Sequence, residues 1–281
     1  MTIVVTGASG DLGRRVTTEL LARVPADELV LVSRTPDALA AGVETRFGDF
    51  DDPAGLHEAF RGGDRMLLIS SVVTGPKRVE QHRAAIAAAE SAGVEHIAYT
   101  SLVGVAEDNP AAVAADHLAT ERALTDARPE VTFLRHSWYG DVIAHGLAPA
   151  AVRTGRWTIN TGEGRVAPIA KDDAAAAAAV VLTTDGHRGR TYDVTGPELV
   201  TIGDLAAIAS ELTGRPVEHD DVDDDAMRDI FLEAGVDRPG DLVSFGRAIR
   251  EGWFAVPTGD VEALTGRPGR TMRELLEASL A

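Results

Sequence analysis

A glycine pattern near the start of the chain constrains its fold more than any other feature. The stretch IVVTGASGDLGRR, residues 3–15, places Gly7, Gly10 and Gly13 at intervals of three residues directly after an apolar run. A turn from a strand into a helix does not require three glycines. In a dinucleotide-binding turn, the first permits the tight turn, the second lets the backbone approach a diphosphate and the third lets the helix pack close to the sheet. The strand–turn–helix context therefore favours dinucleotide binding over a purely structural turn.

Strand-like and helix-like segments alternate after this turn. The strand candidates are short runs rich in apolar and β-branched residues, at 2–7, 29–33, 43–49, 65–71, 96–101, 131–137 and 190–196. Helical patterns cover 12–23, 77–93, 169–182 and 201–214, and the capping-box spacing of Thr271 and Glu274 predicts a last helix. Several strands are apolar on both faces, as in a parallel sheet covered by helices. This order predicts an α/β fold, a doubly wound parallel sheet of the Rossmann type that binds ligands outside the carboxyl ends of its strands.

An acidic run in the second half has two interpretations. Residues 219–225 read HDDVDDD, which could be a calcium-binding loop or the solvated start of a helix. The run lacks the glycine and the distal glutamate of an EF-hand loop. A solvated helix start is therefore favoured.

The composition excludes several classes of function. With 27 Lys and Arg against 44 Asp and Glu, the net charge is −17, which disfavours general binding to nucleic acid or anionic membranes. The chain has no cysteine, which excludes disulfides, a thiol nucleophile and cysteine-ligated metals. Its eight histidines are scattered without metal-ligand spacing, so no metal site is expected. With neither a signal peptide nor an apolar run of the roughly 20 residues that span a bilayer, we expect a soluble, cytoplasmic protein.

Residues at two strand ends bear on which dinucleotide binds. The second strand ends at Ser33 and Arg34, where an NAD enzyme normally places an acidic residue on the ribose 2′-hydroxyl. The Arg34 guanidinium can pair with a 2′-phosphate through two hydrogen bonds, so NADP(H) is favoured over NAD(H), although exposed arginines are common at strand ends. Asp49, after the third strand, could meet the adenine ring. Its alternative role is an Asx turn or the cap of the next helix.

Five segments of the chain resemble a known family. TGASGDLG, MLLISS, QHRAAIAAAESAGVEHIAYTSL, FLRHSWYGD and the closing LTGRP are similar, in this order, to the NmrA-like atypical short-chain dehydrogenase/reductases. Within that family the chain resembles most the NAD(P)H:quinone oxidoreductases of type 2 and the related triphenylmethane-dye reductases. The resemblance implies an NAD(P)-binding Rossmann domain over residues 1–200, with 147–164 reaching into a smaller α/β substrate lobe formed by residues 201–281.

The resemblance also implies a place for each part of the cofactor. The glycine loop would hold the pyrophosphate, and Arg34 would hold the 2′-phosphate. The end of the fourth strand would border the ribose and nicotinamide, while segment 136–141 would close over the nicotinamide and the substrate, with Lys171 and Arg165 nearby. Together with Asp49, the expected cofactor-binding residues are Gly7, Ala8, Ser9, Gly10, Asp11, Leu12, Gly13, Arg34, Ser70, Ser71, Val72, His136, Ser137, Trp138 and Tyr139.

The catalytic pair of typical short-chain dehydrogenases is missing. In their Tyr-x-x-x-Lys motif, the lysine lowers the pKa of the tyrosine, which passes a proton to a carbonyl oxygen. No tyrosine of this chain is followed by lysine four residues on. The expected region reads ADHLATER, with His117 in place of the tyrosine and Arg122 one step too late. The quinone reductases have a histidine and a shifted lysine there, so the arginine is a departure that puts a proton relay at this position in doubt.

The missing pair favours some acceptors over others. Hydride transfer to a quinone leaves a delocalised hydroquinone anion, for which water or one donor suffices, whereas a ketone leaves a basic alkoxide that needs a strong proton donor. Weak candidates for the donor are His117, which could instead be a surface or helix-facing histidine, and Tyr139. Trp138 and Tyr139 could sandwich a flat aromatic ring or pack in the core. Ser101 could bond an oxygen or cap a loop.

Three functions are compatible with these residues. The first is an NADPH-dependent reductase that transfers hydride directly to a quinone or similar electron-poor aromatic acceptor, with no flavin required. The second is an NmrA-like regulator that senses NADP(H) without turnover, since it too would lack the catalytic pair. The third, an epimerase or ether reductase, needs the missing proton-transfer residues. Steady NADPH consumption separates the first from the second, and the oligomeric state is left open.

Overall fold

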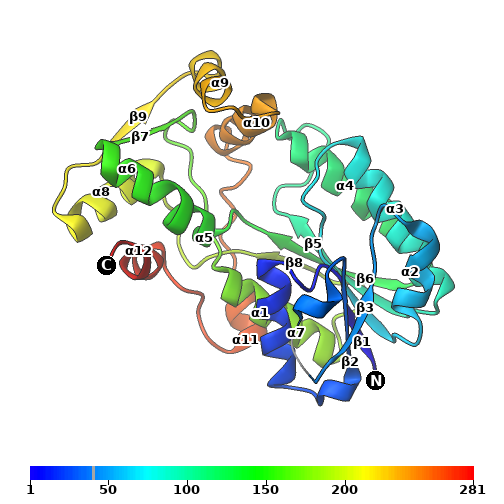
Figure 1. The fold of residues 1–281 in the computed structure, drawn as a ribbon. Coiled ribbons are helices and arrows are strands. Elements are labelled where there is room, and N and C mark those ends of the chain that lie inside the picture. Colours follow the sequence, from blue (N-terminus) through cyan, green and yellow to red (C-terminus); the bar gives the residue numbers. More distant parts are fainter. Residues whose placement is uncertain (40–41) are drawn as a thin grey trace. The chain divides into compact units, whose positions relative to one another are not determined.

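The computed structural model describes residues 1–39 and 42–281 (Figure 1). The chain divides into two compact units, each built from separate stretches of sequence. Unit 1 consists of Met1–Leu102, Asp116–Arg135 and Ala174–Tyr192. Unit 2 consists of Val103–Ala115, His136–Asp173 and Asp193–Ala281.

A seven-stranded sheet in the order β3-β2-β1-β4-β5-β6-β8 confirms the predicted doubly wound fold. Its strands are β1 (Ile3–Val5), β2 (Leu29–Ser33), β3 (Glu44–Phe47), β4 (Arg65–Leu68), β5 (His96–Leu102), β6 (Glu130–His136) and β8 (Thr191–Val194). The central strand β1 is parallel to both neighbours, so that Val4 stands opposite Val30 on one side and Met66 on the other. All residues of β1, β2 and β4 are buried, as expected for a sheet covered on both faces.

Helices cover both faces of the sheet in unit 1. Helices α1 and α7 lie on one face, and α2, α3 and α4 lie on the other (Figure 1). A core of buried side chains that includes Phe60, Ile86 and Leu124 joins the second group of helices to the strands. These helices are α1 (Asp11–Leu21), α2 (Pro53–Phe60), α3 (Pro76–Ser91), α4 (Ala112–Thr125) and α7 (Lys171–Thr183), with short 3-10 turns η1 (Ala26–Glu28) and η2 (Pro36–Ala38).

Unit 2 contains the two helix starts that capping-box spacing predicts. The side chains of Thr201 and Thr271 each accept the N–H group three residues on, and the acidic residue there returns the bond. Helix α8 ends at Gly214 in the left-handed conformation. The helices of unit 2 are α5 (Gly140–Val142), the π-helical turn η3 (Ile143–Leu147), α6 (Ala148–Thr154), α8 (Ile202–Thr213), α9 (Asp224–Glu233), α10 (Pro239–Arg250), α11 (Asp260–Thr265) and α12 (Met272–Leu280).

The two strands of a small second sheet in unit 2 were not among the strand candidates from the sequence, although an α/β substrate lobe was expected. Strands β7 (Arg156–Ile159) and β9 (Glu218–Asp221) pair in parallel. Strand β9 takes up the beginning of the acidic run, whose remainder starts helix α9: the Asp223 carboxylate accepts the Ala226 N–H at 2.8 Å. The run is thus a helix start preceded by a short strand, and the described residues contain no cluster of His, Asp and Glu that could hold a metal.

The two compact units are not divided at a single position in the chain. Unit 2 contains residues 147–164 and 201–281 together with 103–115, 136–146, 165–173 and 193–200. The segments that enter unit 2 follow β5, β6 and β8, which are neighbours in the sheet.

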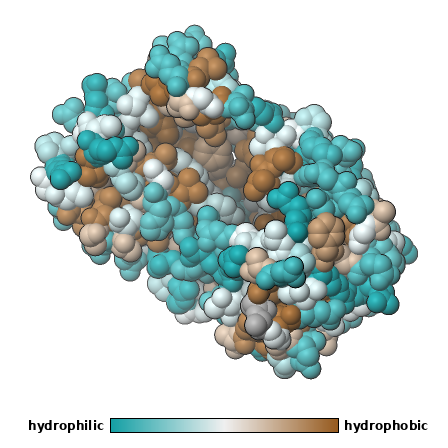
Figure 2. All heavy atoms as spheres, in the orientation of Figure 1, coloured by the Kyte–Doolittle hydropathy of each residue, from teal (hydrophilic) through white to brown (hydrophobic). Residues whose placement is uncertain are grey.

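The exterior carries many hydrophilic side chains. Figure 2 shows hydrophilic side chains over much of the visible face of both units, interspersed with apolar groups. Among the described residues, no helix combines the length and the apolar character needed to cross a bilayer.

Candidate cofactor-binding site

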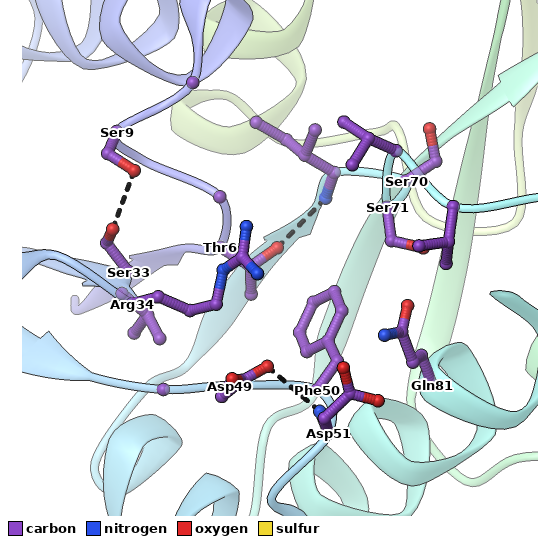
Figure 3. Close-up of a pocket in the computed structure, with 17 residues that line it drawn as sticks. Thr6, Ser9, Ser33, Arg34, Asp49, Phe50, Asp51, Ser70, Ser71 and Gln81 are labelled. Atoms are coloured by element: carbon purple, nitrogen blue, oxygen red, sulfur yellow. Dashed lines mark hydrogen bonds between the residues drawn. The ribbon is translucent and has the colours of Figure 1, made fainter. Parts of the chain in front are cut away.

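A hollow of about 260 Å³ opens in unit 1 beside the carboxyl ends of β1 to β4 (Figure 3). This is where a doubly wound sheet binds its ligand. Eight of the predicted site residues line it together, namely Gly7, Ser9, Gly10, Arg34, Asp49, Ser70, Ser71 and Val72. Unit 1 therefore brings the glycine turn, the end of β2 and the end of β4 to one place.

The turn after β1 depends on its glycines. Gly7 has φ +61°, a conformation that side chains with a Cβ rarely adopt. A Cβ on Gly13 would lie 2.4 Å from the Gly7 carbonyl oxygen and 2.7 Å from the Ala8 Cα. A Cβ on Gly10 would stand 3.2 Å from the same oxygen. The close approach of helix α1 to the turn thus excludes a side chain at Gly13, as the glycine pattern predicts.

Bonds to β2 hold this turn in place. The Ala8 N–H donates to the Val32 carbonyl at 3.2 Å, and Ser33 Oγ donates to Ser9 Oγ at 2.7 Å (Figure 3). Ser33 Oγ also accepts the Thr35 N–H at 3.0 Å. Ser33 is therefore engaged in shaping the turn rather than in binding a ribose.

Helix α1 begins at the turn without a side-chain cap. Gly10 is its N-cap residue, and the backbone bond from the Arg14 N–H to the Gly10 carbonyl is 3.0 Å long. The Leu12 and Gly13 amides precede that bond, so they have no acceptor inside the helix. Such amides, with the positive end of the helix dipole, suit a phosphate group.

Arg34 supplies the positive charge on the rim of the hollow. Its exposed side chain reaches over the hollow from the end of β2 (Figure 3). In the part of the chain that the structure describes, no hydrogen bond or ion pair engages the guanidinium. The nearby Asp51 is already paired with Lys77 at 2.7 Å. Hydrogen bonds from Lys77 and Gln81 lower the pKa of Asp51, so the carboxylate stays charged but compensated.

Asp49 forms an Asx turn, which is one of the alternative roles that the sequence suggests for it. Its Oδ1 accepts the Asp51 N–H at 3.0 Å, which is an Asx turn. The residue also lines the hollow, so the turn presents its side chain beside the adjoining Phe50 (Figure 3).

The segment after β4 is held by bonds to its backbone. The Ser70 N–H donates to Thr100 Oγ1 at 2.9 Å, and the Ser71 N–H donates to His82 Nε2 at 3.0 Å. Val72, the last predicted residue of this segment, is 89% exposed at the rim of the hollow. The segment thus has a defined conformation before any ligand binds.

Two buried polar atoms of the lining residues have no partner among the described residues. They are Ser71 Oγ and Gln81 Oε1. Both residues lie on the side of the hollow opposite Arg34 (Figure 3). Because buried polar atoms are rarely left without a hydrogen bond, these two fit a ligand that carries hydroxyl or amino groups. The residues present therefore fit a dinucleotide.

Sequence reasoning missed Gln81 and His82. They are adjacent on α3, and both are buried, at 6% and 0% exposure. Gln81 lines the hollow, while His82 holds the Ser71 backbone. In the sequence they stand among charged residues in the first half of the helix, so their residue types alone do not say what the pair contacts.

His117 is buried in the structure, so it is not an exposed proton donor. The side chain is 5% exposed and faces Tyr99, whose hydroxyl lies 2.8 Å from His117 Nδ1. His117 Nε2 lies 3.4 Å from Arg78 Nη1. Ser101 is also engaged within unit 1, since its hydroxyl donates to Glu121 at 2.6 Å. The alternatives of a helix-facing histidine and a structural serine are thus favoured for these two residues.

Segment 136–141 belongs to unit 2. His136 Nδ1 lies 2.8 Å from the Tyr139 hydroxyl, and Lys171 Nζ lies 5.4 Å from the centroid of the Tyr139 ring. Trp138 meets Phe245 edge to face, with 5.5 Å between ring centroids. Ser137 is buried, and the weaker candidate Arg165 is exposed. The residues expected near the nicotinamide and substrate thus form their own cluster of aromatic and polar side chains.

Comparison with known proteins yields one family match and several relatives. Residues 7–185 match the family described as NAD(P)H-binding. Quinone oxidoreductase 2 of Escherichia coli is 40% identical over 221 residues, which cover 77% of this chain and 76% of that protein.

Solved structures agree with this match over the full length. The crystal structure of an NADPH-dependent quinone oxidoreductase from Escherichia coli, complexed with NADPH, is 33% identical, with a TM-score of 0.95 and coverage of 100% of both chains. The Citrobacter sp. triphenylmethane reductase is 33% identical, with a TM-score of 0.92 and coverage of 100% of this chain and 99% of that one.

Proposed function

The chain belongs to the NAD(P)H-binding family, and we propose that it is an NADPH-dependent reductase that transfers hydride to a quinone or similar electron-poor aromatic acceptor. One observation carries the proposal: among the described residues, a glycine turn, an arginine whose guanidinium makes no hydrogen bond or ion pair, and two polar atoms without partners surround one hollow at the ends of β1 to β4. The similar quinone oxidoreductase from Escherichia coli was crystallised as a complex with NADPH.

The phosphates and the polar groups of the nucleotide have chemically suited partners in unit 1. The amides at the start of α1 would receive the pyrophosphate, and Arg34 would receive the 2′-phosphate. The unpartnered Ser71 Oγ and Gln81 Oε1 would bond hydroxyl or amino groups of the nucleotide. Bound NADPH supplies the hydride, and the protein supplies position and electrostatics.

The acceptor class follows from the missing tyrosine–lysine pair and from the relatives. Two similar proteins are a quinone oxidoreductase and a triphenylmethane reductase. Quinones and cationic dyes are electron-poor, and neither product of hydride transfer is a strongly basic alkoxide. An acceptor of this kind is reduced without the strong general acid that a simple ketone requires.

We assign acceptor binding to unit 2. Trp138, Phe245 and Phe254 form a chain of ring contacts there, with centroids 5.5 Å and 4.6 Å apart. Aromatic side chains stack readily on flat aromatic ligands. This cluster is consistent with the expectation that Trp138 meets the substrate. It adds the partly buried Phe245 as a second ring for the acceptor, whereas the fully buried Phe254 packs against Phe245.

The regulator hypothesis is not favoured. Two of the similar proteins are named as an oxidoreductase and a reductase, which implies turnover by those proteins. A sensor would bind NADP(H) without consuming it, and nothing in unit 1 favours that outcome over hydride transfer.

Turnover assays test the proposed function directly. The full chain is mixed with NADPH and with a panel of benzoquinones, naphthoquinones and cationic triphenylmethane dyes, and the loss of NADPH absorbance is followed. We expect sustained oxidation of NADPH with several of these acceptors and little with aliphatic ketones. Calorimetric binding of NADPH without turnover on any acceptor would instead favour a sensor.

A further inference from the structure

In unit 2, the Tyr139 ring lies beside the Lys171 ammonium, and hydrogen bonds connect the two chain segments that carry these residues. Lys171 Nζ is 5.4 Å from the ring centroid. A parallel bridge joins Tyr139 to Ile169, and the Gly140 N–H donates to the Ile169 carbonyl at 2.9 Å. The Lys171 N–H donates to Asp141 Oδ2 at 2.7 Å. These bonds bring the backbones of Tyr139 and Lys171 together, and the ammonium lies beside the phenol ring.

His136 contacts the hydroxyl end of the same phenol. Its Nδ1 lies 2.8 Å from Tyr139 Oη, and the two rings are edge to face with centroids 5.7 Å apart. His136 is 2% exposed, and burial lowers its pKa to about 4, so the imidazole is neutral at physiological pH. A neutral imidazole carries one hydrogen, which resides on either Nδ1 or Nε2.

The unpartnered ring nitrogen decides between these two tautomers. His136 Nε2 is buried, and no described residue bonds it. A buried N–H without an acceptor is rarer in proteins than an under-satisfied acceptor atom. The hydrogen therefore resides on Nδ1 and is donated to Tyr139 Oη. This directs the phenol's own hydrogen away from His136.

Both neighbours favour the phenolate over the phenol. A positive charge beside the ring stabilises the negative form, and so does a hydrogen bond donated to its oxygen. Two carboxylates stand next to these residues in the chain: Asp141 Oδ2 accepts the Lys171 N–H, and Asp172 is paired with Arg270. The arrangement thus has the electrostatic effect of the missing Tyr-x-x-x-Lys pair, although the lysine here comes from the start of α7 instead of the same helix turn.

We propose that Tyr139 is the proton donor to the reduced acceptor and that Lys171 and His136 are its positioning residues. This rests on the proposed function. A quinone that has gained hydride carries one negative charge. The O–H bond of Tyr139 breaks, a new O–H bond forms at the anionic quinone oxygen, and the phenolate regains a proton from water. A cationic triphenylmethane dye becomes neutral on gaining hydride and needs no proton, so the two acceptor classes depend on Tyr139 differently.

Titration of the tyrosines tests the pair without any turnover. The chain has three tyrosines, so carbon-13 labelling at Cζ gives few signals, and Tyr139→Phe identifies one of them. We expect Lys171→Met to move the titration of Tyr139 upward by about one pH unit and Lys171→Arg to restore it. Tyr192 serves as the control, because its hydroxyl makes a matched 2.8 Å bond to His187 Nδ1. A Tyr139 signal that titrates alike with and without Lys171 overturns the proposal.

The two acceptor classes test proton donation itself. Tyr139→Phe should slow the reduction of a quinone by about ten-fold or more relative to the reduction of a cationic dye. Tyr192→Phe removes a hydroxyl from a similar tyrosine–histidine pair and should leave that ratio unchanged. Equal losses with both acceptors would assign Tyr139 to acceptor binding and overturn proton donation. If the unsubstituted chain reduces neither class, the proposed function itself is wrong, whereas the titration still shows whether the pair interacts.

Discussion

His82 Nε2 accepts a hydrogen bond of 3.0 Å from the backbone N–H of Ser71, in the segment that follows β4. The other ring nitrogen, Nδ1, lies 2.9 Å from Thr120 Oγ1, whose own hydrogen is donated to the Asp116 carbonyl. Nδ1 must therefore carry the hydrogen and Nε2 the lone pair. Burial lowers the pKa of His82 to about 3, which preserves this neutral form. A buried histidine thus holds the backbone of the segment after β4, which lines the candidate cofactor site.

Replacing His82 should weaken both the fold and the binding of NADPH. His82→Leu leaves the Ser71 N–H without its acceptor, at a cost of about 1–3 kcal/mol in the free energy of unfolding. His82→Gln keeps an acceptor near the position of Nε2 and should lose less. Urea unfolding and NADPH titrations of both variants measure the two effects. Equal losses in the two variants would mean that the bond to Ser71 is not what matters at this position.

Stability should fall in mild acid because histidines are buried in the neutral form. Burial lowers the pKa of His82 to about 3 and those of His96 and His136 to about 4. Between pH 6.5 and 5 the unfolded chain binds protons at these residues and the folded chain does not, so the free energy of unfolding decreases as the pH falls. Each histidine contributes about 1.4 kcal/mol per pH unit. Urea unfolding at several pH values in this range gives the slope.

A single substitution checks the origin of that slope. His96→Gln should reduce the slope by the share of one histidine, whereas replacement of the exposed His145 by glutamine serves as the control. An unchanged slope in His96→Gln would show that other groups cause the acid sensitivity.

Gly13→Ala should damage the glycine turn. The new Cβ would lie 2.4 Å from the Gly7 carbonyl oxygen and 2.7 Å from the Ala8 Cα, both of them backbone atoms that cannot rotate away. We expect a loss of about 1–3 kcal/mol in the free energy of unfolding and a marked loss of NADPH affinity. Gly240→Ala is the matched control, since Gly240 is also a helix residue but its Cβ would meet no heavy atom within 4 Å. Normal NADPH binding by Gly13→Ala would contradict the close packing of α1 on the turn.

The features predicted correctly from the sequence are mostly local ones. Gly7 and Gly13 occupy positions set by the strand–turn–helix motif itself, and the starts of α8 and α12 follow from bonds that span three residues. Such features need no knowledge of distant packing. They are therefore readable from spacing and residue type.

The features that were missed depend on tertiary contacts. Gln81 and His82 reach the site because α3 packs against the strand ends, and Lys171 meets Tyr139 through a bridge between separate segments. Strand β7 is four residues long and finds its partner β9 far along the chain. Spacing within the sequence carries no signal for pairs of this kind.

Arg34→Ala should weaken the binding of NADPH far more than that of NADH. The guanidinium is exposed at the rim of the hollow, and only NADPH offers the 2′-phosphate to which it could donate. Loss of a charge-assisted hydrogen bond of about 1.5–3 kcal/mol corresponds to roughly 10-fold to 100-fold weaker NADPH binding. Calorimetric titrations with both cofactors measure the ratio. Arg83→Ala, which removes an exposed arginine of α3 outside the hollow, controls for the change in net charge. If Arg34→Ala and Arg83→Ala weaken NADPH alike, the 2′-phosphate is bound elsewhere.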